Sequence, residues 1–157
     1  MDFKTLNANK GLLFQDLALV ELAINRLISL EYIGSHDQKF ISEFLQEPRF
    51  SFELRKRIFK RIFQRRYPEI KFPWHELDEL QRIRNIVAHA RVDEEVRKLN
   101  GEVIEVIRKP FYAYHTETMD AENLHEEFQT NLHPIMETLN KIVSDTKIKF
   151  TREEPIT

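Results

Sequence analysis

The stretch from Leu12 to Tyr32 is the feature that most restricts how this chain can fold. Its apolar residues recur at helical spacing, and together they cover most of the circumference of the helix that this spacing predicts. The polar residues fall on one narrow ridge, chiefly Glu21, Asn25 and Ser29 at intervals of four. A helix that is apolar almost all round has to be buried on more than one side. It is therefore either the central helix of a monomeric bundle or a helix whose second side is covered by another subunit, for which Val20 and Ile24 are candidate contacts.

The composition indicates one domain with a sizeable core. The chain has 157 residues, is 41% hydrophobic and contains 12 Phe. It has no Cys, which excludes disulfides, thiol chemistry and thiolate metal sites. No basic segment followed by a clean apolar run opens the chain, and its best apolar stretch, Leu17 to Ile24, is too short to span a bilayer. We expect a soluble cytoplasmic protein with no membrane association.

The rest of the chain predicts further helices. Gly34 and Ser35 end the first one, and residues 36–46 form a short second one with Phe40, Phe44 and Leu45 facing inward. Ser51 caps a helix that runs to about residue 66. Pro73 suits the first turn of the next helix, with Trp74 as a packing anchor. Residues 1–11 read as a short lead-in.

After Arg91 the spacing of apolar residues changes, and a β-hairpin is predicted at about 95–109. Asn100 and Gly101 tolerate the positive φ values of a tight hairpin turn. Asp120 then caps a long helix to about residue 144, which Pro134 is expected to kink. Residues 146–157 read as a tail. The predicted fold is a single all-α domain over 1–157, a bundle of four to five helices with a β-hairpin insertion.

Charge is unevenly distributed along the chain although the net charge is only −2. Residues 55–66 contain seven cations and no acid. Among these, Arg57, Lys60 and Arg61 share one helical face, opposite the apolar residues. This face is either an ordinary solvated surface or a surface that binds an RNA backbone.

The candidate functional residues are Arg84, Asn85 and His89, near the end of the helix that begins after Pro73. Asn85 and His89 are four residues apart, so they share a face, and Arg84 lies about 140° around the axis from His89 at about 100° per residue. A cation, an imidazole and an amide together suit a phosphate substrate. The alternative is structural, because the helix dipole alone favours Arg and His near a helix C-terminus.

The segment from Leu80 to His89 closely resembles the signature of the HEPN (higher eukaryote and prokaryote nucleotide-binding) superfamily, in which Arg, a polar residue such as Asn and then His follow one another near the end of a bundle helix. Here Arg84, Asn85 and His89 match, and the small Ala88 is common in one branch. The specific part covers about ten residues, the helical order fits over most of the bundle, and the hairpin lies outside the family pattern.

The resemblance implies metal-independent RNA cleavage, in which the ribose 2′-hydroxyl attacks the adjacent phosphate. His89 would act as general acid or base, since an imidazole ordinarily titrates near neutral pH. Arg84 would hold the phosphate, and Asn85 would orient His89 or the phosphate. Family sites usually lie between two subunits that contribute one motif each. The implied role is a homodimeric toxin or antiviral-defence effector, with no metal or cofactor and with an antitoxin or regulatory protein as a further partner.

An alternative function remains open, that of a non-catalytic HEPN module that binds a nucleotide or a protein partner.

This chain differs from one branch of the family at a regulatory position. That branch carries a modified Tyr two residues after the His, where this chain has Arg91, so we expect no such modification. Arg82 and Arg91 are instead candidate RNA contacts beside the motif. The other histidines show no metal-binding spacing, and we predict packing rather than base stacking for Tyr112 and Tyr114.

Overall fold

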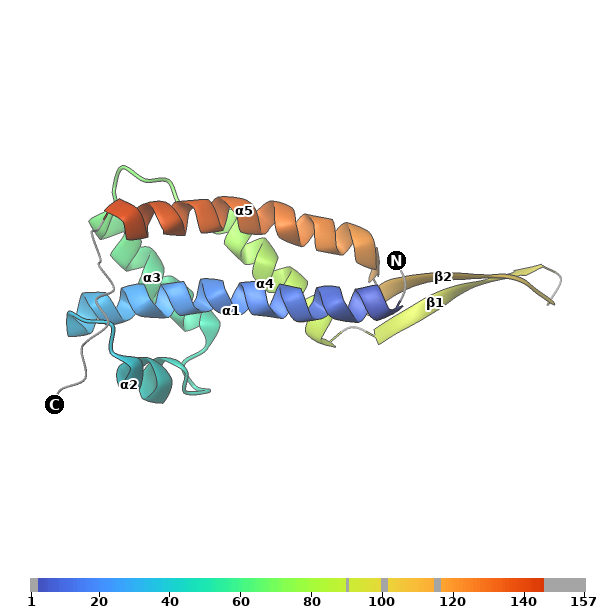
Figure 1. Cartoon of the computed structure of the whole chain (residues 1–157), viewed down its shortest axis with the longest axis horizontal. Helices are drawn as coiled ribbons and strands as arrows, with labels where there is room; N and C mark the ends of the chain where they lie inside the picture. The colour runs from blue at the N-terminus through green and yellow to red at the C-terminus, as the bar shows by residue number, and fades with distance from the viewer. Residues whose placement is uncertain (1–2, 90, 100–101, 115–116, 146–157) are drawn as a thin grey trace.

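The computed structural model describes residues 3–89, 91–99, 102–114 and 117–145. Its helices are α1 (Phe3–Ile33), α2 (Gln38–Phe40), the π-helix η1 (Ile41–Leu45), α3 (Phe52–Arg66), α4 (Trp74–His89) and α5 (Ala121–Asp145). Its strands are β1 (Arg91–Leu99), β2 (Glu102–Tyr114) and β3 (Glu117–Asp120). Helices α1, α3, α4 and α5 pack as a bundle, and the β1–β2 hairpin projects from one end of it (Figure 1). The predicted helical bundle with a hairpin insertion is confirmed at this level.

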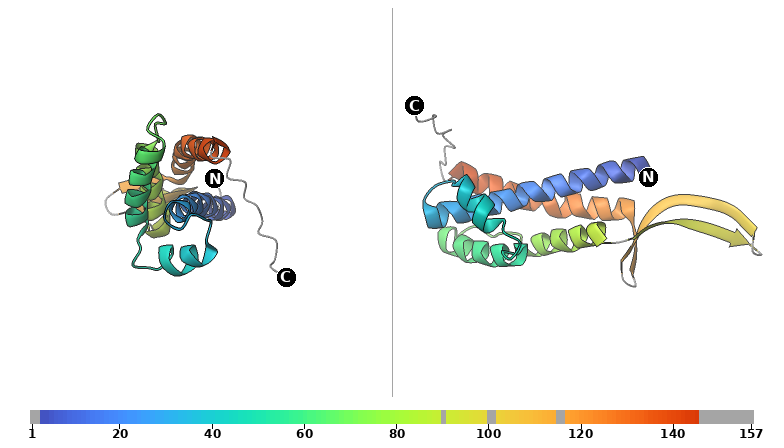
Figure 2. Two further views of the ribbon diagram at one scale, coloured as in Figure 1. Left: turned by 90° about the vertical axis from the view of Figure 1, so that its left-hand side faces the viewer. Right: turned by 90° about the horizontal axis from the view of Figure 1, so that it is seen from below.

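Helix α1 runs the length of the bundle beside α5 (Figures 1 and 2). It begins at Phe3, so the expectation of a lead-in over residues 1–11 is wrong. Gly11 weakens this first part, but burial of Leu6 and Leu13, at 2% and 3% exposure, outweighs its low helix propensity. The helix ends as predicted at Gly34, which has φ +80° and donates its N–H to the carbonyl of Leu30 over 3.1 Å.

The core-facing side of α1 carries the residues that the sequence offered as dimer contacts. Val20 and Ile24 are both 0% exposed, so neither can form a surface between subunits. The outer side is apolar as well, and we call it the α1 face. It consists of Leu12, Phe14, Ala18, Leu19 and Leu22, of which Leu12, Leu19 and Phe14 are 52%, 49% and 39% exposed. Part of the apolar circumference of α1 therefore remains uncovered in the single chain.

The short second helix is confirmed, and so is the inward position of Leu45, which is buried together with Ile41; Phe40 is partly buried against the core. The inward position predicted for Phe44 is wrong, because Phe44 is 51% exposed and stacks on Phe40. The π-helical turn of η1 changes the residue spacing, which a regular 3.6-residue pattern does not capture. The Ser51 cap is confirmed, since its hydroxyl accepts the N–H of Leu54 over 3.2 Å.

An aromatic cluster joins α3 to the start of α4. The ring of Trp74 packs on those of Phe59, Phe63 and Phe72, with ring centroids 4.3–5.8 Å apart. Trp74 is thus the predicted packing anchor. Such ring pairs add about 0.5–1.5 kcal/mol each beyond the area they bury, so they fix where α4 begins.

The sheet is larger than the hairpin predicted at 95–109. Strand order is β1-β2-β3, with both pairs antiparallel, and pairing already begins at Arg91 opposite Ala113. Tyr112 in β2 is 3% exposed and packs into the core, as predicted; its burial raises the pKa of its hydroxyl to about 12. Asp120 caps α5 as predicted, accepting the N–H groups of Glu122 and Asn123 at 2.9 and 3.1 Å. The tail at 146–157 lies outside the described residues.

Candidate functional site

The packing of α4 determines which motif residues reach the surface. Its inward stripe is fully apolar and consists of Leu77, Leu80, Ile83, Ile86 and Val87, all at most 5% exposed. Arg84, Ala88 and His89 therefore lie on the outer side of the helix, and Asn85 is half-buried. His89 is the last residue of α4, and β1 begins at Arg91.

The structure joins Arg84 to Asn85 and leaves His89 apart from them. A guanidinium nitrogen of Arg84 donates to the amide oxygen of Asn85 over 3.1 Å. Within the described residues no hydrogen bond connects His89 to either of them. This agrees with the angular separation of about 140° between Arg84 and His89 on one helix. Asn85, one turn before His89, lies between them around the axis. One chain alone thus presents the Arg84 guanidinium and the His89 imidazole on different sides of α4.

Arg84 lines two adjoining hollows, of about 360 and 310 Å³, between α4, α1 and the start of α3. Both hollows share Leu17, Glu21, Gln46, Arg55 and Arg84. One hollow extends to Phe50, Phe52 and Gln81, whereas the other extends to Phe14, Ala18 and Leu22. The guanidinium of Arg84 therefore stands where a mixed polar and aromatic hollow meets the α1 face.

The floor of these hollows contains a charged network that the sequence analysis missed. Arg55 is only 9% exposed; it donates to Glu21 over 3.1 Å and to the side-chain oxygen of Asn25 over 3.2 Å. The ε-nitrogen of Arg55 and the amide nitrogen of Asn25 are buried without a hydrogen-bond partner in the described structure. A signal was present, since position 55 continues the inward stripe of Phe59 and Ile62 at i, i+4 and i+7.

The candidate RNA-binding residues divide into two groups. Arg57, Lys60 and Arg61 are all exposed on α3, as predicted, and the Lys60 ammonium lies 5.4 Å from the Trp74 ring centroid. Because Trp74 precedes Arg84 by ten residues of α4, the two positions are about 15 Å apart along the helix axis. Arg82 is held by Glu79 over 2.6 Å and by Glu127, and the hydrogen bond to Glu79 raises its pKa. The side chain of Arg91 lies outside the described residues.

Other cations of the run at 55–66 are paired with acids. Arg65 and Arg66 both bind Glu31, and Lys56 lies 2.7 Å from Glu53 and 2.6 Å from Asp78. Burial lowers the pKa of Lys56, but the hydrogen bonds to Asp78 and Glu53 outweigh it and raise the pKa overall. Only the Arg57, Lys60 and Arg61 face thus retains the character that the sequence predicted for the run.

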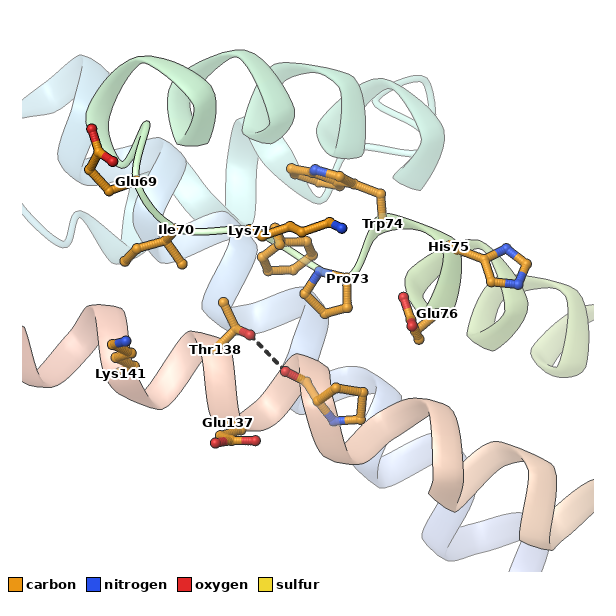
Figure 3. Close-up of a pocket in the computed structure, with 12 residues that line it drawn as sticks. Glu69, Ile70, Lys71, Pro73, Trp74, His75, Glu76, Glu137, Thr138 and Lys141 are labelled. Atoms are coloured by element: carbon orange, nitrogen blue, oxygen red, sulfur yellow. Dashed lines mark hydrogen bonds between the residues drawn. The ribbon is translucent and has the colours of Figure 1, made fainter.

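A larger hollow, of about 710 Å³, lies elsewhere, between the loop that precedes α4 and the side of α5 (Figure 3). Both basic and acidic side chains line it, Lys71 and Lys141 together with Glu69, Glu76 and Glu137. None of the motif residues lines it, and its balanced charge does not select an anion.

Comparisons with known proteins find no relative of this chain. No family model, no curated protein and no solved structure matches this chain. In the described part of the chain, no helix is both long and apolar enough to cross a bilayer. Across the same residues, no three His, Asp or Glu side chains are grouped as metal ligands. Function is therefore inferred from Arg84, His89 and their surroundings.

Proposed function

We propose that this protein is a metal-independent endoribonuclease of the HEPN type, acting in the cytoplasm as a homodimer. The observation that carries the proposal is the placement of Arg84 and His89. Both are exposed on the last turns of α4, and Arg84 lines a hollow with polar and aromatic walls. Neither side chain supports the fold from within the core, so both are accessible to a substrate.

The proposed chemistry is cleavage by the neighbouring ribose. The 2′-hydroxyl loses its proton to a base and attacks the adjacent phosphorus, and the bond from phosphorus to the 5′-oxygen breaks. The products are a 2′,3′-cyclic phosphate and a 5′-hydroxyl, which takes up a proton from an acid. His89 serves in one of these proton transfers. Arg84, oriented by its hydrogen bond to Asn85, binds the phosphate and stabilises the charge that develops on it.

We infer a second copy because the guanidinium of Arg84 and the imidazole of His89 of one chain lie on different sides of α4. The α1 face supplies an apolar surface for that copy, and three of its residues, Phe14, Ala18 and Leu22, line the same hollow as Arg84. A subunit seated there would lie directly beside Arg84. We infer that the active site is composite and forms along this contact, with one Arg84 and one His89 from each subunit.

The proposed biological role is that of a toxin or antiviral-defence effector controlled by a protein partner. A ribonuclease that needs neither a metal nor a cofactor is active as soon as its subunits associate. Such an enzyme needs external control in a cell whose RNA it can cleave.

The deciding experiment is incubation of the purified protein with total RNA in EDTA. Wild type, His89→Ala and Arg84→Ala are compared with His75→Ala and Arg65→Ala, which remove an exposed histidine of the same helix and an exposed arginine of α3. Cleavage that resists EDTA, persists in both control variants and is lost in both motif variants supports the proposal. Cleavage by His89→Ala at the wild-type rate contradicts it.

The second candidate function is a non-catalytic module that binds a nucleotide or a protein partner. It is favoured by the separation of His89 from Arg84 around α4 in the single chain. A correctly folded dimer that leaves RNA intact, but binds a nucleotide through Arg84, would support this function instead.

A further inference from the structure

Strand β1 lies at one edge of the three-stranded sheet. Its only neighbour among the described strands is β2, which lies between β1 and β3. Strand β2 contacts α4 and α5, but the outer part of the β1–β2 hairpin extends well beyond the bundle (Figures 1 and 2). One side of β1 therefore presents a row of backbone N–H and C=O groups with no neighbouring strand in the described structure.

Most devices that protect an edge strand are absent from β1. It has nine residues and contains neither Pro nor Gly. The register shifts of the hairpin fall between Glu94 and Glu95 and between Arg97 and Lys98, and in both places the extra residues belong to β2. Strand β1 itself is continuous and therefore suitable for pairing with another strand. Charged residues are the only protection that it retains.

Those charges are arranged in a self-complementary order. After Arg91 and Val92, three acids, Asp93, Glu94 and Glu95, precede the two bases Arg97 and Lys98. A parallel, in-register neighbour of the same sequence would place like charges side by side. An antiparallel copy would place the acidic half of each strand opposite the basic half of the other, and opposite charges across a pair stabilise a sheet.

One register satisfies the whole strand. Directly opposite residues of an antiparallel pair lie on the same face of the sheet, so the numbers of opposite residues in two identical β1 strands add up to an even sum. With Val96 on the two-fold axis, Glu95 stands opposite Arg97 of the second copy and Glu94 opposite Lys98 of the second copy, and the symmetry repeats each pair. No like charges meet. The hairpin from residue 91 to 109 carries five acids and five bases, so its charge does not favour a polyanion such as RNA.

We propose that β1 is a self-association surface, which pairs antiparallel with β1 of a second copy of this chain, Glu94 opposite Lys98 and Glu95 opposite Arg97. The two sheets then become one, with the β1 strands at its centre. The symmetry axis of such a contact passes through the middle of β1 and places the two bundles at opposite ends of the joined sheet. The contact is therefore separate from the α1 face and does not depend on the proposed catalytic function.

The experiment exchanges the charges at one register pair. In the hairpin, Glu94 faces Pro110 and Lys98 faces Val103, so reversing either charge adds no like-charge pair within the chain's own hairpin. Association of Glu94→Lys, of Lys98→Asp, of their 1:1 mixture and of the double variant is measured by analytical ultracentrifugation at low salt. Low salt is chosen because exposed ion pairs are screened at high ionic strength. Lys39→Asp, an exposed cation in α2, is the matched control.

Each single variant is expected to raise the dissociation constant of the β1 contact by at least about tenfold, because two attractive pairs become repulsive. The mixture and the double variant are expected to restore it, and Lys39→Asp to leave it unchanged. Single variants that associate like wild type overturn the proposal, and so does a weakening that neither the mixture nor the double variant reverses. RNA cleavage retained by single variants that no longer associate through β1 separates this contact from the catalytic one.

Discussion

The Arg55 guanidinium donates to the Glu21 carboxylate over 3.1 Å, and both side chains line the two hollows that Arg84 also lines. Arg55 ties α3 to α1 at this point, and its second bond, to Asn25, reaches the next turn of α1. Two residues of the polar ridge of α1 are thereby explained, because Glu21 neutralises a cation that α3 buries and Asn25 accepts a hydrogen bond from it. The third, Ser29, instead donates to the carbonyl of Ser35 over 2.8 Å and accepts the N–H of Asp37 over 3.1 Å.

Arg55→Ala is expected to lower the free energy of unfolding by about 2–4 kcal/mol, since it leaves Glu21 without its partner in a largely buried position. The lower end of this range allows for the partial exposure of Glu21. Chemical denaturation measures the change, and Arg57→Ala, an exposed cation two residues further on, is expected to stay within about 0.5 kcal/mol of wild type. Equal effects of the two substitutions would show that the Arg55 pair contributes nothing to stability.

Dimerisation through the α1 face is tested by two neighbouring substitutions. Leu19 is 49% exposed and Val20 is 0% exposed. Leu19→Glu is expected to give a folded monomer, because it places a charge in the proposed contact at little cost to the single chain. Val20→Glu is expected to unfold the chain, since it buries an unpaired charge. Light scattering and circular dichroism distinguish the two results.

RNA cleavage is a second readout for the same face. A composite site requires two copies, so Leu19→Glu is expected to lose cleavage together with dimerisation. A monomeric Leu19→Glu that cleaves RNA at the wild-type rate would contradict the composite site while leaving the roles of Arg84 and His89 in place.

The helices were predictable where local signals agree with the tertiary packing. The Ser51 and Asp120 caps and the left-handed Gly34 are local features, and the structure has all three. Prediction failed where tertiary packing decides the structure. Residues 3–11 join α1 because Leu6 is covered by other elements, and Phe44 turns outward because a π-turn shifts the spacing.

The candidate site shows the same division. The exposure of Arg84 and His89 follows from the apolar stripe of α4 and was visible in the sequence. The burial of Arg55 was hidden by its place in a basic run, because the acid that neutralises it is 34 residues away. The partners of Arg82 and Arg65 are also distant, at Glu127 and Glu31. The order of charges along a sequence does not reveal which cations are paired with acids that are distant in the sequence and close in the fold.

His36 is expected to make stability fall at acidic pH. Burial is the first cause that lowers its pKa and the charge of Arg26 is the second, with Asp37 acting in the opposite direction. The folded state therefore binds this proton less readily than the unfolded state, and stability decreases as pH falls through the ordinary histidine value, near 6.5. Denaturation at pH 7.5 and pH 5 is compared between wild type and His36→Asn. Identical decreases in both proteins would exclude His36 as a source of the pH dependence.

The exposed cations Arg57, Lys60 and Arg61 give the last prediction. If this face follows an RNA backbone, changing all three to Gln weakens RNA binding and flattens its salt dependence, by a log–log slope of up to about 0.7 for each phosphate of single-stranded RNA that the variant no longer neutralises. The cleavage rate at saturating RNA is expected to remain near wild type, since these residues lie on α3 and Arg84 and His89 lie on α4. Stability is also expected to change little, because surface charges contribute about 0–1 kcal/mol.

Binding is measured by fluorescence anisotropy at several salt concentrations. The control changes Arg65 and Arg66, which bind Glu31, to Gln. A triple variant with the salt slope of wild type would make this face an ordinary solvated surface.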